Sequence, residues 1–176
     1  PTGAGAVEHF GLQGRVPVVM GTLSKALGAQ GGYVAGSRDL CVYLRTRARG
    51  FVFTTALAPA AAGAALAALD VVRDEPWRRA RLHALVARLV AAIEALGFTV
   101  LPTGSAVIGV LVGEARPALD LAAELRRRRV WAPAIRPPTV PAGMARLRLT
   151  AMATLEERHV EWALGALAEA RRVAVC

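Results

Sequence analysis

The chain has 176 residues, 55% of them hydrophobic but only 5% aromatic, which suits one ordinary domain or one domain with part of another. The formal net charge of +9 would normally raise nucleic acid as a partner. However, the arginines alternate with Ala and Leu rather than with stacking aromatics, and the densest run, Arg126 to Arg129, ends a predicted helix. We therefore expect a solvated helix end rather than a nucleic-acid site.

Cysteine and histidine give no further site. Cys41 and Cys176 form no disulfide framework, and the three histidines lack metal-ligand spacing, so no metal site is predicted. The apolar stretch 56–69 is too short to span a bilayer, and no signal peptide is visible. These features favour a cytoplasmic protein with reduced thiols and no membrane partner.

The first predicted elements surround a glycine-rich loop. Pro17 to Met20 reads as a short buried strand that leads into the loop Gly21-Thr22-Leu23-Ser24-Lys25-Ala26-Leu27-Gly28. The following segments predict, in order, a strand at 32–36, a helix at 38–47, a strand at 51–55 that ends in Thr54 and Thr55, and an Ala-rich helix with Pro59 in its first turn.

Lys25 is the only lysine among the 22 Lys and Arg residues. An amine can deprotonate and attack a carbonyl, whereas a guanidinium effectively cannot, so its survival among arginines points to Schiff-base chemistry. Nearby glycines suit a close approach of backbone to a bulky ligand, and the hydroxyls of Thr22 and Ser24 could reach a phosphate. The alternative is an ordinary surface lysine.

Beyond Asp70 the pattern predicts alternating helices and strands. Apolar residues from Leu82 to Ile93 recur at helical spacing, and this helix is expected to end at Gly97. The predicted order then runs through strands at 98–101 and 106–112 around a turn at 102–104, a helix at 118–125, a strand at 130–135, a Pro-rich connector at 136–143 and a strand at 145–150. Thr154 and Glu157 have the spacing of a capping box for a final helix.

The strand at 145–150 carries two candidate ligand-binding arginines. Arg146 and Arg148 share one face of the strand, and Leu147 and Leu149 share the other. An arginine aimed at a substrate carboxylate would bind it with two parallel hydrogen bonds. A solvated edge strand fits the pattern equally well.

Three segments together carry a family resemblance. GTLSKALGAQGGYVAG, FVFTTALAP and IRPPTVPAGMARLRLT, in this order and spacing, resemble the alpha-oxoamine synthases, which are fold-type I enzymes that use pyridoxal 5'-phosphate (PLP). The resemblance implies an α/β fold in which residues 1–72 are the C-terminal part of the cofactor-binding large domain. Residues 73–176 would be the small α/β C-terminal domain, and a homodimer is implied.

The resemblance also implies roles for individual residues. Lys25 matches the lysine that binds PLP covalently and then serves as acid and base at the substrate alpha carbon. Thr22 matches a hydroxyl that binds the cofactor phosphate, and Thr54 and Thr55 match a segment that reaches the phosphate of the neighbouring subunit. Arg148 matches the arginine that holds the amino-acid carboxylate.

The implied activity is an acyl transfer with loss of carbon dioxide. The segment Arg136 to Gly143 is similar to the branch that condenses L-alanine with pimeloyl-coenzyme A, or with pimeloyl on acyl carrier protein (pimeloyl-ACP), to 8-amino-7-oxononanoate in biotin synthesis. One alternative is a sister activity on glycine, of the 2-amino-3-ketobutyrate ligase or 5-aminolevulinate synthase type. The other is a non-catalytic basic interaction module.

The sequence departs from the family pattern in its length. Family members are longer at the N-terminus, where an aspartate pairs with the pyridine nitrogen and a histidine stacks on the ring. Neither motif occurs in this sequence. We therefore expect the chain to correspond to the C-terminal part of such an enzyme and to be inactive alone.

Overall fold

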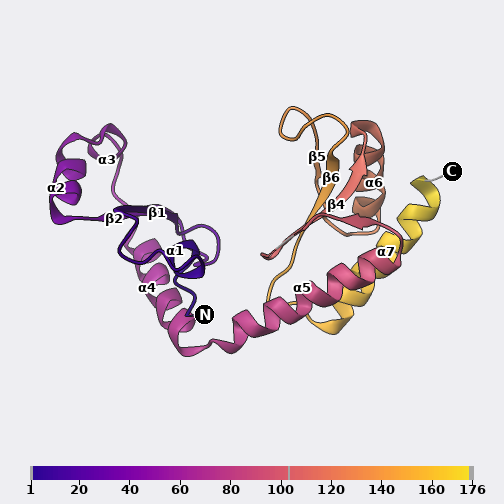
Figure 1. The fold of residues 1–176 in the computed structure, drawn as a ribbon, viewed down its shortest axis with the longest axis horizontal. Helices are drawn as coiled ribbons and strands as arrows, with labels where there is room; N and C mark the ends of the chain where they lie inside the picture. The colour runs from indigo at the N-terminus through magenta and orange to yellow at the C-terminus, as the bar shows by residue number, and fades with distance from the viewer. Residues whose placement is uncertain (1, 103, 175–176) are drawn as a thin grey trace. The chain divides into compact units, whose positions relative to one another are not determined.

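A computed structural model describes residues 2–102 and 104–174 (Figure 1). The chain divides into two compact units, Pro1–Pro76 and Trp77–Cys176. The division follows Pro76 rather than residue 72, because helix α4 (Pro59–Asp74) continues past residue 72. Cys176 and the middle residue of the predicted 102–104 turn lie outside the described residues.

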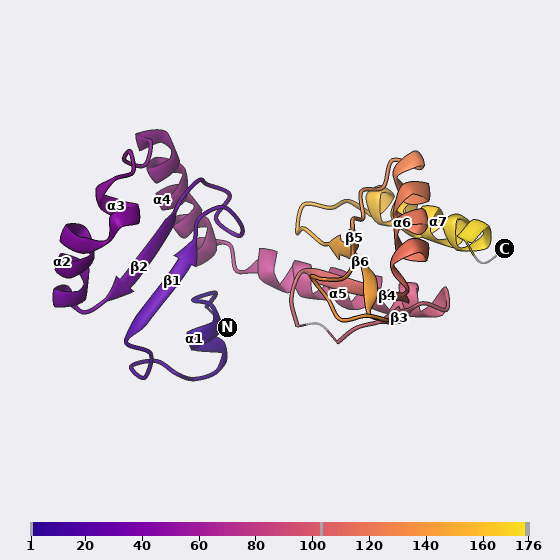
Figure 2. The same ribbon diagram turned by 90° about the horizontal axis from the view of Figure 1, so that it is seen from above.

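The first unit is built on a β-hairpin. Its elements in chain order are α1 (Ala6–His9), β1 (Val18–Thr22), β2 (Gly32–Gly36), α2 (Arg38–Arg47), α3 (Arg49–Val52) and α4. Strands β1 and β2 pair antiparallel, with Val18 opposite Gly36 and Thr22 opposite Gly32 (Figure 2). The predicted strands around the lysine loop and the predicted helix at 38–47 are thus confirmed, but the predicted burial of the first strand is wrong, because Val18 is 48% and Met20 76% exposed.

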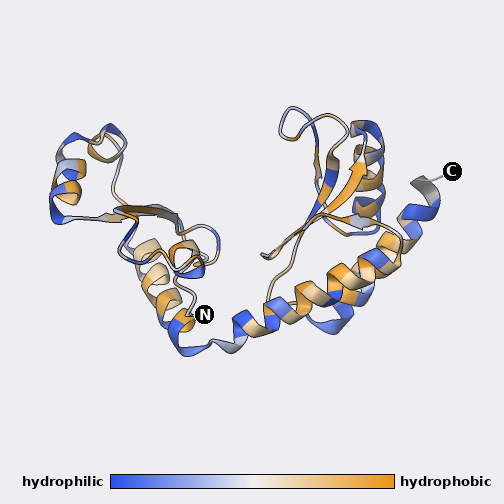
Figure 3. Ribbon diagram, in the orientation of Figure 1, coloured by the Kyte–Doolittle hydropathy of each residue, from blue (hydrophilic) through white to orange (hydrophobic). Residues whose placement is uncertain are grey.

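Little of the first unit is buried. Helix α4 is largely apolar along its length (Figure 3). Ala65 is nevertheless the one buried residue among those described in this unit, whereas Met20 is 76% and Phe53 78% exposed. Within this chain the first unit therefore has no apolar core of its own among the described residues.

The predicted strand at 51–55 is wrong. The amide of Val52 donates to Ala48 O at 2.9 Å and that of Phe53 to Arg49 O at 3.0 Å, which closes the short helix α3. Aromatic and β-branched residues favour a strand only where a partner strand supplies ladder bonds. The described residues offer 51–55 no such partner, so local helical bonds form instead and Thr54 lies in a bend.

The N-terminal loop of the first unit is closed by a carboxylate. Glu8 in α1 accepts hydrogen bonds from the hydroxyl and amide of Thr2, at 2.6 and 2.9 Å, and from the amides of Gly3 and Ala4, both at 3.1 Å. These bonds, with that of the Thr2 hydroxyl the largest cause, lower the pKa of Glu8 from 4.5 to about 2.

The second unit contains a four-stranded antiparallel sheet. Its elements in chain order are α5 (Trp77–Ala95), β3 (Thr99–Val100), β4 (Val107–Gly113), α6 (Ala115–Arg127), β5 (Ala134–Ile135), β6 (Ala145–Thr150) and α7 (Glu157–Ala174). The strand order is β3-β4-β6-β5, so β4 and β6 are central. The predicted strands at 98–101 and 130–135 shrink to the two-residue strands β3 and β5, because only those residues pair with a neighbour.

One face of this sheet carries the core of the unit. Ile108, Val110 and Leu147 are fully buried and pack with Ile93 of α5 and Leu125 of α6. Helix α6 contacts three strands and also α7, which buries Val160 and Leu167. The apolar periodicity predicted for 82–93 is also confirmed, because Val86, Leu89 and Ile93 of α5 are buried.

Of the two helix ends with a predicted signal, the C-terminal end of α5 is confirmed and the N-terminal end of α7 differs. Gly97, at φ 81°, follows α5 as expected, and the amides of Gly97 and Phe98 donate back to Glu94 O and Ile93 O. The capping box of Thr154 and Glu157 is wrong. Helix α7 begins at Glu157, and the amide of the preceding Glu156 donates to Nδ1 of His159 at 3.1 Å. An imidazole thus takes the place of the predicted carboxylate.

The buried sheet face predicts the cost of truncating a core side chain. Leu147→Ala should destabilise the second unit by about 2–5 kcal/mol, because it removes a fully buried side chain and leaves a cavity. Trp77, Trp131 and Trp162 are all the tryptophans of the chain and lie in this unit, so urea unfolding followed by tryptophan fluorescence measures the loss. The control Leu119→Ala, at a position 44% exposed on α6, should change the free energy of unfolding by less than about 1 kcal/mol.

The carboxylate of Glu8 predicts a pH dependence of the N-terminal loop. Its pKa in the fold is below the ordinary value, so its stabilising contribution is present above pH 4.5 and is lost as the pH falls through about 2. The amide resonances of Gly3 and Ala4 should shift over this range. In Glu8→Gln the shift should be absent; a shift of the same size in that variant would contradict the assignment.

Candidate active site

Lys25 lies on the loop that joins β1 to β2. The amide of Leu23 donates to Gly31 O at 2.9 Å, the amide of Ala29 to Leu23 O at 2.8 Å, and the amide of Gly28 to Lys25 O at 3.0 Å. These bonds fold the loop back on itself while the lysine side chain stays exposed. Among the described residues no carboxylate pairs with it, so its amine is available to a ligand.

Two glycines give this loop its shape. Gly31 has φ 113°, and a Cβ there would lie 2.9 Å from Cδ1 of Leu57. A Cβ at Gly21 would lie 2.5 Å from the ring of Tyr33. The positive φ requires glycine at position 31, whereas a side chain at position 21 would require the ring of Tyr33 to move. The approach of Leu57 to Gly31 also brings the segment after Thr55 next to the lysine loop.

The predicted phosphate hydroxyl belongs to a small polar cluster. Oγ1 of Thr22 lies 2.7 Å from Oγ of Ser24 and accepts a hydrogen bond from the amide of Ser24 at 3.2 Å. Both side chains are exposed. The cluster therefore presents two hydroxyls three residues or fewer from Lys25.

Thr54 and Thr55 follow α3 in the same unit. Both are exposed, and the part of the chain that the structure describes supplies no hydrogen bond to either hydroxyl. The contact of Leu57 with Gly31 places the segment that contains Thr54 and Thr55 near the lysine loop.

Arg148 lies in the second unit, on the face of the sheet opposite the core. It faces Gly109 across the β4–β6 ladder, its amide donates to Pro133 O at 3.0 Å, and its side chain is exposed. A cavity of about 470 Å³ opens here, and Arg146 and Arg148 both line it. Nε of Arg146 donates to Met144 O at 3.0 Å, which anchors that side chain, whereas the guanidinium of Arg148 has no such bond among the described residues.

Sequence reasoning missed other residues of this cavity. Thr139 and Val140, from the connector between β5 and β6, and Ser105, which precedes β4, also line it. The Pro-rich composition of the connector, where the Pro137–Pro138 peptide is cis, was the available signal for the first two. Ser105 had no signal beyond its place after Gly104.

Two classes of site are not found among the described residues. No cluster of three or more His, Cys, Asp or Glu side chains is placed to hold a metal ion. No helix within residues 2–102 and 104–174 combines the length and the apolar character needed to cross a membrane.

Comparison with known proteins identifies the family. The sequence model of the aminotransferase class I and II family matches residues 2–167. The chain therefore belongs to this family. An 8-amino-7-oxononanoate synthase from Anaeromyxobacter dehalogenans is 54% identical over 169 residues, which are 96% of this chain and 43% of that protein. One from Pseudomonas aeruginosa is 47% identical over 172 residues, 97% of this chain and 43% of that protein.

A solved structure supports the same family. Serine palmitoyltransferase from S. paucimobilis, with a bound PLP-myriocin aldimine, matches with a TM-score of 0.91 and 27% identity over 99% of this chain and 44% of that chain. The predicted α/β fold of fold-type I PLP enzymes and the predicted resemblance to 8-amino-7-oxononanoate synthases are thus confirmed. The chain spans less than half the length of these proteins.

Proposed function

We propose that this chain forms the C-terminal part of a PLP-dependent acyltransferase that condenses L-alanine with pimeloyl-coenzyme A or pimeloyl-ACP, with loss of carbon dioxide, to give 8-amino-7-oxononanoate. The observation that carries the proposal is the lysine loop between β1 and β2 in a chain 54% identical to a protein of that name. The enzyme in this proposal is a homodimer, as the predicted roles of Thr54 and Thr55 require, and it is cytoplasmic.

The donors on the loop fit PLP. An aldehyde carbon needs an amine, which Lys25 supplies, and a phosphate needs hydrogen-bond donors, which Thr22 and Ser24 supply. The exposed hydroxyls of Thr54 and Thr55 fit a phosphate held by a second subunit. When bound, PLP stores the electron pair left at the alpha carbon after bonds there break.

The residues of this chain then have separate tasks. Lys25 would hold the cofactor until the amino acid binds, and would then move the proton at the alpha carbon of that amino acid. Arg148 binds the carboxylate of the amino acid and fixes its orientation, which decides which bond at the alpha carbon breaks. Arg146, already bonded to Met144 O, keeps the wall of the cavity in place.

The competing possibility is the related reaction on glycine. Arg148 would bind the carboxylate of either amino acid, so this residue does not distinguish them. The similarity to serine palmitoyltransferase also supports a scaffold that accepts different amino acids. Coenzyme A release measured with L-alanine and with glycine, in a complete enzyme that contains this chain, separates the two reactions. Turnover with glycine alone would contradict the proposal.

Lys25 should be the one side chain that carries PLP covalently. Borohydride treatment of the PLP-loaded chain, followed by peptide mapping, should place the pyridoxyl group on the peptide that contains Leu23 to Ala26. Lys25→Arg keeps the charge but has no amine that reacts, so this peptide should lose the label. A label confined to the N-terminal amine in the unmodified chain would refute the role of Lys25.

Arg148 should set the affinity for L-alanine. Arg148→Lys removes the planar fork and should weaken L-alanine binding by about 1.5–3 kcal/mol, the scale of a hydrogen bond to a charged group. The matched variant Arg146→Lys should have a smaller effect, because that guanidinium is bonded to the backbone. The L-alanine concentration that half-saturates the change in PLP absorbance measures both, and an unchanged value in Arg148→Lys would remove this residue from the site.

A further inference from the structure

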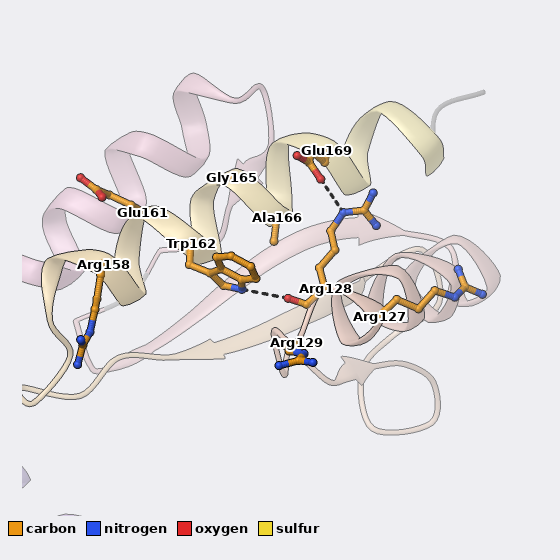
Figure 4. Close-up of a pocket in the computed structure, with 9 residues that line it drawn as sticks. All are labelled: Arg127, Arg128, Arg129, Arg158, Glu161, Trp162, Gly165, Ala166 and Glu169. Carbon is orange, nitrogen blue, oxygen red and sulfur yellow. Dashed lines mark hydrogen bonds and ion pairs between the residues drawn. The ribbon is translucent and has the colours of Figure 1, made fainter.

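A second cavity lies in the second unit, between the C-terminal turn of α6 and the side of α7 (Figure 4). Its volume is about 710 Å³, within the range of about 300–1,000 Å³ of small-molecule sites. The lining residues are mostly charged and surround one indole: Arg127, Arg128, Arg129, Arg158, Glu161, Trp162, Gly165, Ala166 and Glu169. None of them belongs to the proposed active site.

The indole of Trp162 is held in place yet accessible. Its Nε1–H donates to the carbonyl oxygen of Arg128 at 3.0 Å, which fixes the ring between α7 and the turn (Figure 4). The residue is nevertheless 60% exposed. Gly165 lies three residues after Trp162 in α7. The space beside it is open, because a Cβ at this position would have no atom within 4 Å. A fixed aromatic face beside a small-residue floor suits a planar ring.

Arg129 occupies a backbone position that favours glycine. The amides of Arg129 and Val130 donate to Arg126 O and Leu125 O, which closes the end of α6, and Arg129 has φ 60°. Helix α5 ends with the same two bonds, and there Gly97 takes the left-handed position. A guanidinium at this place in α6 therefore has a conformational cost that glycine would avoid.

The charges of the cavity are not balanced. Glu169 accepts from Nε of Arg128 at 3.0 Å, and Arg127 and Arg128 pair with Glu124. Among residues 2–102 and 104–174, Arg158 pairs only with exposed Glu156, at 3.0 Å, and exposed pairs of this kind exchange partners at little cost. In the part of the chain that the structure describes, no carboxylate pairs with Arg129. In the view of Figure 4, the indole lies between Arg158 and Arg129, and Glu169 lies beside Arg128.

We propose that this cavity binds a nucleotide, such as one with an adenine base, with the base stacked on Trp162 and the phosphates paired with Arg129. A guanidinium group can donate two parallel hydrogen bonds to a phosphate. Stacking of a base on an aromatic side chain contributes a binding free energy similar to that of a hydrogen bond to a charged group. The adenosine phosphate can come from a free nucleotide such as ATP or from the nucleotide part of coenzyme A.

Isothermal titration calorimetry of the 176-residue chain at low ionic strength tests the proposal with ATP, coenzyme A and pyrophosphate. Trp162→Ala and Arg129→Gly should each weaken binding of the nucleotide about tenfold, the effect of losing one stacking or one charged contact. Arg129→Gly suits the backbone, so its unfolding midpoint in urea should not fall. The matched control Arg116→Ala removes one positive charge from α6 outside the cavity and should leave the affinity unchanged.

Each outcome decides between sources or against the site. Binding of ATP but not coenzyme A points to free nucleotides, and the reverse points to the coenzyme; either supports the proposal. Pyrophosphate binding as tight as that of both nucleotides, together with no effect of Trp162→Ala, would show adsorption of any polyanion and overturn it. Equal losses in Arg116→Ala and Arg129→Gly, or no binding of either nucleotide, would overturn it as well.

Discussion

The alternation of side chains along β6 is the constraint on which the second unit depends. Successive residues of a strand point to opposite faces, so burial of Leu147 against the helices sends Arg146 and Arg148 to the other face. A shift of one residue in register would exchange core and ligand-binding residues together. Pairing with β4, where Gly109 lies opposite Arg148, fixes this register and leaves room beside the guanidinium groups.

The lysine loop follows a different principle. Its shape comes from hydrogen bonds between Leu23, Ala29 and Gly31, and not from buried side chains. Such a loop holds its backbone locally and leaves Lys25 exposed, which suits an amine that must change its covalent partner during a reaction cycle. The exposed position of Lys25 and the family assignment both fit the role proposed for this lysine.

Local patterns predicted those features that local forces determine. The strict alternation at 145–150 and the helix end at Gly97 follow from the sequence because period and backbone preference are properties of a few neighbouring residues. The segment 51–55 was mistaken for a strand because its composition does not reveal whether a partner strand exists. The cavity beside Trp162 was missed for a similar reason. Arg126 to Arg129 lie at a helix end as predicted, but Trp162 reaches these arginines only because α6 packs against α7.

The uneven burial of the two units has a consequence for cooperativity. The second unit has a contiguous core, so its residues open to solvent together in one transition. In the first unit, where Ala65 is the one buried residue among those described, segments can open separately at a free-energy cost near that of a fraying helix end. Amide hydrogens of β1 and β2 should therefore exchange through local openings, and a melting temperature of this chain is a property of residues 77–174 rather than of the whole polypeptide.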